Sequence, residues 1–170
     1  MSGSGTTTSS GDIFIKTAES APSAGVSGAV IMSSGNANGG TSGALHFVTG
    51  TGSASGGDIE LTVGSGATGG GDVIVTGGAA AANLGGDVSV SGGDSAGTSG
   101  GAVSITSGRG TDTASSSGEV IVATAESSDP GGVSGQIYLS SGEANGGASG
   151  TVKLLSGDAS TSGGNIELTV

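Results

Sequence analysis

The chain lacks cysteine and tryptophan, and its 170 residues include only 2 prolines, 2 phenylalanines and 1 tyrosine. The absence of cysteine excludes disulfide bonds and cysteine-based metal or redox sites. The shortage of large apolar side chains argues against a conventional globular core, because such cores are built mainly from Leu, Ile, Val and Phe. Any core of this chain is therefore expected to be thin and repetitive.

Basic residues are also scarce. Lys and Arg total 3, at Lys16, Arg109 and Lys153, and the net charge is -11. This balance argues against nucleic acid or an anionic membrane surface as the partner. No apolar stretch approaches the length of a membrane span, so no membrane insertion is expected. The first residues, Met1–Gly5, lack the basic and apolar regions of a secretory signal.

What the chain does contain is glycine, with 40 residues, and short runs of β-branched residues. The run Gly56–Thr62 has glycine first, then a polar residue, then apolar residues that alternate with polar ones. Similar runs begin at Gly71, Gly86 and Gly101, and one returns at Gly163. A short strand-like unit that recurs at a near-fixed interval is typical of a solenoid.

Cutting the sequence before each Ser-Gly or Gly-Gly pair gives eleven starts, spaced 14 to 17 residues apart. We therefore predict an all-β, single-stranded β-solenoid (a parallel β-helix or β-roll) of about eleven coils, roughly 50 Å long at the usual strand spacing. Each coil would hold about two short strands and two tight corners, with glycine supplying corners of positive φ. The inward positions are predicted to be Ile13, Ile15, Val30, Met32, Leu45, Phe47, Ile59, Leu61, Val73, Val75, Val88, Val90, Val103, Ile105, Val120, Val122, Ile137, Leu139, Val152, Leu154, Ile166 and Leu168.

A longer period lies above the coil. Thr17–Ser20 matches Thr124–Ser127, and Ile59–Val63 matches Ile166–Val170, both at an offset of 107 residues (124 minus 17 and 166 minus 59). Residues 10–116 thus form one super-repeat of seven coils, and residues 117–170 form part of a second. Residues 1–9 are interpreted as a frayed or incomplete first coil of one continuous solenoid over 10–170. Because the last coil stops midway, the chain is interpreted as a piece of a longer tandem array or as a unit that stacks end to end.

No catalytic constellation is evident. The single histidine, His46, lies at an outward position whose super-repeat equivalent is Lys153. Serine is abundant, but a nucleophile also needs a base to activate it, and no such pair can be assembled from these residue types. We therefore expect that the protein is not an enzyme and needs no cofactor.

Asp58, Asp72 and Asp87 are the candidate metal ligands, because they occupy one register in three successive predicted coils. Stacked about 4.8 Å apart, they would repel one another, and Ca²⁺ would relieve that repulsion. The Gly-Gly-Asp runs resemble the calcium-binding nonapeptides of RTX repeats, but their spacing differs, so no ligand role is carried over. A solvated acidic stripe explains the same residues.

Two surfaces have residues suited to binding. Thr62, Thr76, Ser91 and Thr106 form a rank of the kind found in ice-binding solenoids, although Lys16, Val48, Ala123 and Leu155 interrupt it. The second surface consists of apolar side chains at outward positions, and we call it the apolar row. It is predicted to join neighbouring copies laterally. Local cover by the longer coil loops is the alternative, and the Ser/Thr-rich corners are possible sites of O-linked glycan. The apolar row consists of Phe14, Ile31, Ile74, Ile121 and Tyr138.

The runs Ser-Gly-x-Val-x-Val-x-Ser-Gly and Gly-Gly-Asp-Val-Ser-Val-Ser-Gly-Gly recur along the chain. They resemble the long Gly/Ser-rich repeat regions of very large secreted or surface proteins of microalgae, diatoms among them. The resemblance implies an extracellular structural array and brings no site residues with it. We therefore expect a structural protein, a repeat segment of an extracellular or cell-surface filament that pairs with its own copies or neighbouring repeats. The alternatives are an ice-binding solenoid and a calcium-stiffened adhesin extender.

Overall fold

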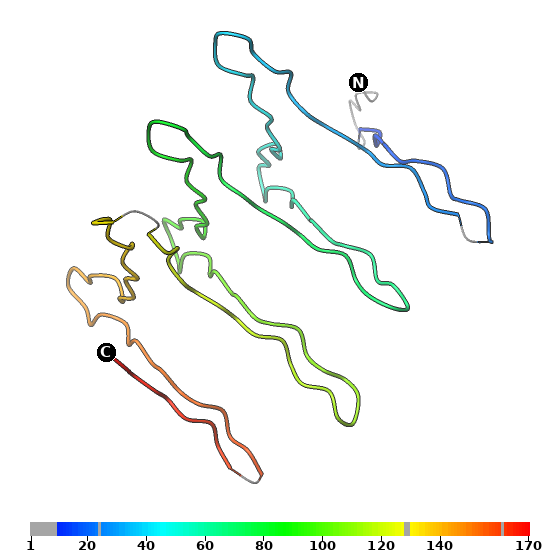
Figure 1. The fold of residues 1–170 in the computed structure, drawn as a ribbon. Helices are drawn as coiled ribbons and strands as arrows, with labels where there is room; N and C mark the ends of the chain where they lie inside the picture. Colours follow the sequence, from blue (N-terminus) through cyan, green and yellow to red (C-terminus); the bar gives the residue numbers. More distant parts are fainter. Residues whose placement is uncertain (1–9, 24, 128–129, 161) are drawn as a thin grey trace. The chain divides into compact units, whose positions relative to one another are not determined.

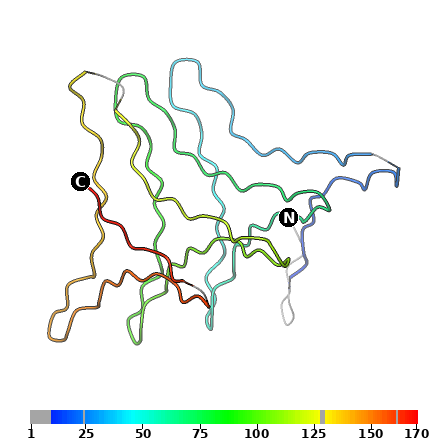
Figure 2. The same ribbon diagram turned by 60° about the horizontal axis from the view of Figure 1, so that its bottom comes forward.

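The computed structural model describes residues 10–23, 25–127, 130–160 and 162–170. Within these residues the chain forms no helix and no β-strand, and it consists of extended runs separated by short bends or turns (Figure 1). The chain divides into two units, Met1–Ala79 and Ala80–Val170. Figure 2 shows that the same serpentine path, out along one run and back along another, is followed within each unit.

The predicted all-β solenoid is therefore wrong for the described residues. A solenoid needs ladders of backbone hydrogen bonds between stacked strands, with adjacent strands about 4.8 Å apart. The backbone hydrogen bonds found in the described residues lie instead within single loops. They run from Gly101 N to Gly93 O (2.8 Å), from Gly118 N to Gly108 O (2.9 Å) and from Ser115 N to Asp112 O (3.1 Å).

The predicted columns of buried aliphatic side chains are absent as well. Among the described residues no hydrophobic side chain is buried, and Ile13, Val73 and Ile137 are 66%, 57% and 50% exposed. Two aliphatic side chains per repeat are few against roughly fifteen backbone positions, each of which costs about 1–2 kcal/mol to fix. Glycine loses more conformational freedom than any other residue when it is fixed. The alternating pattern sets only the direction in which each side chain points, and it does not require that either side be buried.

That alternation of direction is present. In the run around Ile31, the middle side chain is 83% exposed, whereas its neighbours Val30 and Met32 are 54% and 56% exposed. Tyr138 stands in the same relation to Ile137 and Leu139, which are also less exposed than it is. The apolar runs are thus extended and two-sided, as predicted, but neither side is covered.

In the described residues, one bend or turn falls in each predicted coil from residue 10 to residue 162, where two corners per coil were predicted. At the two Asn-Gly-Gly sequences, bends occupy 38–40 and 145–147. Gly39 and Gly146 adopt φ values of 123° and 98°, which side chains rarely tolerate. Bends or turns lie at 22–23, 38–40, 53–54, 67–68, 81–83, 96–98, 112–114, 130–131, 145–147 and 160.

The two sides of a loop approach each other closely where a Ser or Thr faces a glycine, and we call such a pair a loop neck. Thr17 Oγ1 donates a hydrogen bond to Gly28 O (3.1 Å), and a Cβ placed on Gly28 would lie 3.1 Å from Thr17 Cγ2. Only a residue without a side chain fits this approach easily. Further necks, with the distance from the Ser or Thr Cβ to a Cβ built on glycine, are Ser34–Gly43 (3.7 Å), Thr49–Gly57 (3.7 Å), Ser107–Gly118 (3.6 Å), Thr124–Gly135 (3.6 Å), Ser141–Gly150 (3.7 Å) and Ser156–Gly164 (3.9 Å).

Candidate functional surface

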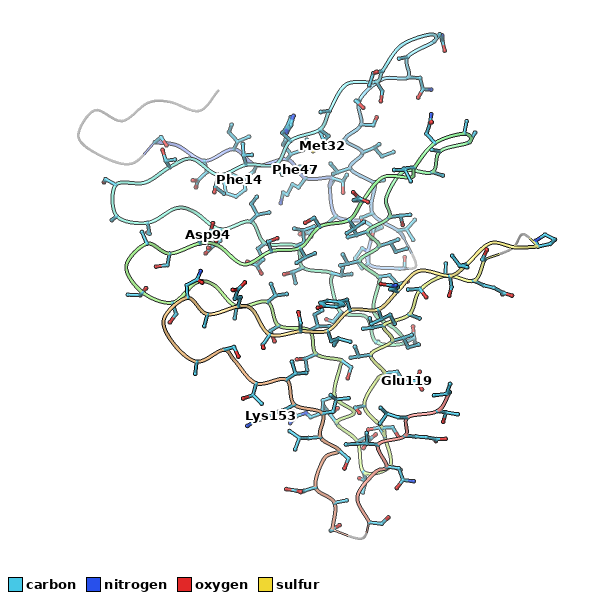
Figure 3. All side chains as sticks on the ribbon, turned by 90° about the vertical axis from the view of Figure 1, so that its left-hand side faces the viewer. Phe14, Met32, Phe47, Asp94, Glu119 and Lys153 are labelled. Carbon is cyan, nitrogen blue, oxygen red and sulfur yellow. The ribbon has the colours of Figure 1, made fainter. Side chains whose placement is uncertain are left out.

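The apolar row lies on the outside of the extended runs. Phe14, Ile31, Ile74, Ile121 and Tyr138 are between 78% and 85% exposed. Removing large apolar side chains such as these from water is favourable, and a partner that covered them would do so. Figure 3 shows the side chains, Phe14 among them, standing off the ribbon along each run. The local cover by long loops that was the alternative is not seen for these side chains.

The opposite side of each run is apolar too, and its side chains range from about half exposed to largely exposed. Val30 and Leu45 in the first unit and Val120 and Val152 in the second unit all keep about half of their surface in contact with water. The five runs that carry a residue of the apolar row thus present two apolar edges, of which the apolar row is the more exposed.

A small apolar depression lies between two successive runs of the first unit. It is lined by Phe47 from one run and by Ile59, Glu60 and Leu61 from the next. The sequence pattern placed Phe47, Ile59 and Leu61 in one inward series, and the structure brings these three together. Glu60 adds a carboxylate at the rim, and this carboxylate accepts a hydrogen bond from Thr62 Oγ1 (2.8 Å).

The candidate calcium ligands are not brought together into a site. Among the described residues, no three His, Cys, Asp or Glu side chains lie close enough to hold one metal ion. Asp58, Asp72 and Asp87 are each exposed. The stacking that would have aligned them belongs to the solenoid, which does not form in the described chain.

His46 is exposed, as is Lys153 at the equivalent position. In the rank considered for ice binding, the hydroxyl of Thr62 is engaged with Glu60, and its equivalent Thr169 donates to Glu167 Oε1 (3.1 Å). A Thr hydroxyl already bonded to a carboxylate is less available to an ice surface. The contact also shows that residues two apart point the same way, as an extended chain requires.

Sequence reasoning missed the loop necks and one compact turn. At 112–115, Ser115 Oγ donates to Asp112 O (2.9 Å) and accepts from Asp112 N (2.8 Å), and Thr113 N donates to Asp112 Oδ1 (3.1 Å). These four residues line a shallow open depression. The signal was present in the sequence, because Asp and Ser close turns with their side chains. Its hydrogen bonds are all internal, so it serves the loop itself.

Comparison with known proteins gives no relative: no family model, curated protein or solved structure matches the chain. Among the described residues, no helix has the length and apolar character needed to cross a membrane. The case for a function consequently depends on the repeats, the exposed apolar edges and the charge of the chain itself.

Proposed function

We propose that this chain is a structural repeat segment of an extracellular or cell-surface filament, which associates with copies of itself or with neighbouring repeats. The observation that carries the proposal is the regular series of exposed apolar side chains, one group in each repeat, with none of the described residues buried. A monomer that leaves so much apolar surface in water gains stability by covering it with a partner.

The repetition supports a linear array. The neck Thr17–Gly28 recurs as Thr124–Gly135, and Ser34–Gly43 recurs as Ser141–Gly150, at the 107-residue offset and with similar distances. A unit that repeats both its sequence and its local geometry presents apolar edges at corresponding positions in each copy. Regular edges are what periodic association needs, since each contact can be made again by the next unit.

The net charge of -11 sets a limit on this association. Like-charged copies repel one another over about 10 Å at 0.1 M salt. Association through apolar edges should therefore strengthen as salt is raised, because salt screens the repulsion and leaves the apolar contact intact. The proposed extracellular setting is supported by the resemblance to Gly/Ser-rich surface repeats, and protease treatment of intact cells of the source would test it.

The test compares two sets of substitutions by sedimentation velocity and negative-stain microscopy of the purified chain. The first replaces Phe14, Ile31, Ile121 and Tyr138 by Ser, and should abolish large assemblies. The control replaces by Ser three apolar residues outside the row that are exposed still more fully, Val26, Leu84 and Val133, which are 91% to 95% exposed. The control should assemble like the unaltered chain. A wild-type chain that stays monomeric at millimolar concentration and high salt would refute the proposal.

A further inference from the structure

The residues 12–16 differ from every other extended run of the chain in their charges. Asp12, Phe14 and Lys16 share one direction along the run, because side chains two residues apart in extended chain point the same way. Their order is acidic, apolar, basic. At the super-repeat equivalent, the order is Glu119, Ile121 and Ala123, so the basic residue is missing there.

The structure keeps this segment extended and open. No helix, turn or bend is assigned anywhere in residues 10–21. Phe14 (Figure 3) is 85% exposed, more than its neighbours Ile13 and Ile15. Both Asp12 and Lys16 are exposed as well. In extended chain the Cα atoms of residues 12 and 16 are about 13 Å apart, too far for the two charges to pair within one chain.

Resting on the proposed self-association, we propose that residues 12–16 form a two-fold contact with the same residues of a second copy. Laid antiparallel about Phe14, the two segments place Phe14 against Phe14 of the second copy. Asp12 of each copy then faces Lys16 of the other, which gives two ion pairs around an apolar centre. A two-fold contact requires one surface to complement itself, and this order of charges does so.

Other pairings of the exposed runs are less complementary. Residues 12–16 against 119–123 would give one ion pair, between Lys16 and Glu119, and would leave Asp12 facing Ala123. Two copies of 119–123 would give none. Charge complementarity thus selects the 12–16 segment as its own partner among the exposed runs, while the apolar centre supplies attraction that does not depend on salt.

Charge reversal tests the register of this contact. Asp12→Lys and Lys16→Asp should each weaken dimerisation about tenfold, since each turns two attractive pairs into two repulsive ones. An equimolar mixture of the two variants should associate as tightly as the wild type, because each now complements the other. The double variant Asp12→Lys/Lys16→Asp should also regain wild-type affinity. Sedimentation equilibrium of the full chain at 0.1 M salt measures all four.

Two controls separate this contact from general charge effects and from the alternative pairing. Asp87→Lys makes the same change of net charge as Asp12→Lys on a run whose middle residue is Ser89, and it should not weaken the dimer. If Lys16→Asp weakens the dimer while Asp12→Lys does not, the partner is the 119–123 segment and the two-fold contact is refuted.

The outcomes also distinguish this inference from the proposed function. If the wild type assembles and the apolar-row variant does not, but the mixture of charge variants gains nothing, the two-fold contact alone fails. If the wild type does not associate, both fail. A covalent check is available because the chain has no cysteine. Phe14→Cys should form disulfide-linked dimers on mild oxidation, whereas Val26→Cys should not.

Discussion

The two copies of the super-repeat agree in their loops and differ on their exposed edges. Residues 10–63 and 117–170 share the necks at Gly28 and Gly135 and the positive-φ bends at Gly39 and Gly146. On the apolar row, however, Phe14 and Ile31 correspond to Ile121 and Tyr138, so the aromatic ring changes place. Lys16 corresponds to Ala123. The loop geometry is thus held by residue types that the close backbone approach demands, whereas the exposed edges need only remain apolar.

The comparison predicts, first, that equivalent necks in the two copies close in the same way. The pairs Ser34→Cys/Gly43→Cys and Ser141→Cys/Gly150→Cys should both form disulfides nearly completely, because both Cβ–Cβ distances are 3.7 Å, within the usual disulfide range. Thiol titration and mass spectrometry under mild oxidation measure this. The control Ser34→Cys/Gly40→Cys should remain reduced, since nothing lies within 4 Å of a Cβ on Gly40. A disulfide that forms in one copy only would show that the two necks are not equivalent.

Second, the apolar edges of the two copies should contribute about equally to assembly. Phe14→Ser/Ile31→Ser and Ile121→Ser/Tyr138→Ser should each weaken association by about 3 kcal/mol, roughly a hundredfold, because each removes two large side chains from the contact. Sedimentation equilibrium measures the change. If Phe14→Ser/Ile31→Ser weakens association more than Ile121→Ser/Tyr138→Ser does, the difference would point to the ion pairs around Phe14. No loss in either pair would mean that these edges face solvent in the assembly.

Third, Gly39→Ala should loosen its bend by about 1–2 kcal/mol, because a side chain is disfavoured at positive φ. The same effect is expected for Gly146→Ala in the second copy. The readout is the fraction of disulfide formed across the corresponding neck, Ser34–Gly43 or Ser141–Gly150. Gly40→Ala is the matched control, as it has an ordinary φ and open space around it. Equal oxidation in Gly39→Ala and Gly40→Ala would show that the bend does not depend on this glycine.

The smallest effect is expected at the hydroxyl–carboxylate contacts. Thr62→Ala and Thr169→Ala remove hydrogen bonds of 2.8 Å and 3.1 Å to Glu60 and Glu167, and both contacts are exposed to water. Each should change the free energy of assembly by less than about 0.5 kcal/mol, as is usual for surface substitutions. Sedimentation equilibrium of both variants checks this. A loss comparable with that of the apolar-row variants would show that these contacts are covered in the assembly.

The sequence alone was sufficient to predict the repeat length, the 107-residue period and the alternation along each run. These features are local, because they depend on residues within one loop or one run. The solenoid required more, since it needed separate runs to come within hydrogen-bonding distance. Alternation at Val30, Ile31 and Met32 does not determine which other run covers them. With two aliphatic side chains per repeat, the pattern could not decide between stacking within the chain and leaving both edges open.

For the candidate surface, the exposure of Phe14 and Tyr138 was foreseen because they stand between inward residues. The calcium column was not found, because its alignment depended on the stacking that is missing. The necks were overlooked because the Ser-Gly pairs were read as starts of coils. The residue that each glycine faces lies 8 to 11 positions earlier, as for Thr49–Gly57 and Thr17–Gly28.

The necks also store chain length that can be released when the chain is stretched. Each neck holds a loop such as 34–43 out of the direct path of the chain, and opening it would release up to roughly 30 Å of fully extended backbone. Thr17 and Gly28 are joined by a single hydrogen bond at the surface, so such a closure yields at low load and forms again when the load is removed. A thread made of these units would lengthen in small reversible steps before any of its covalent backbone came under tension, and pulling single molecules would resolve those steps.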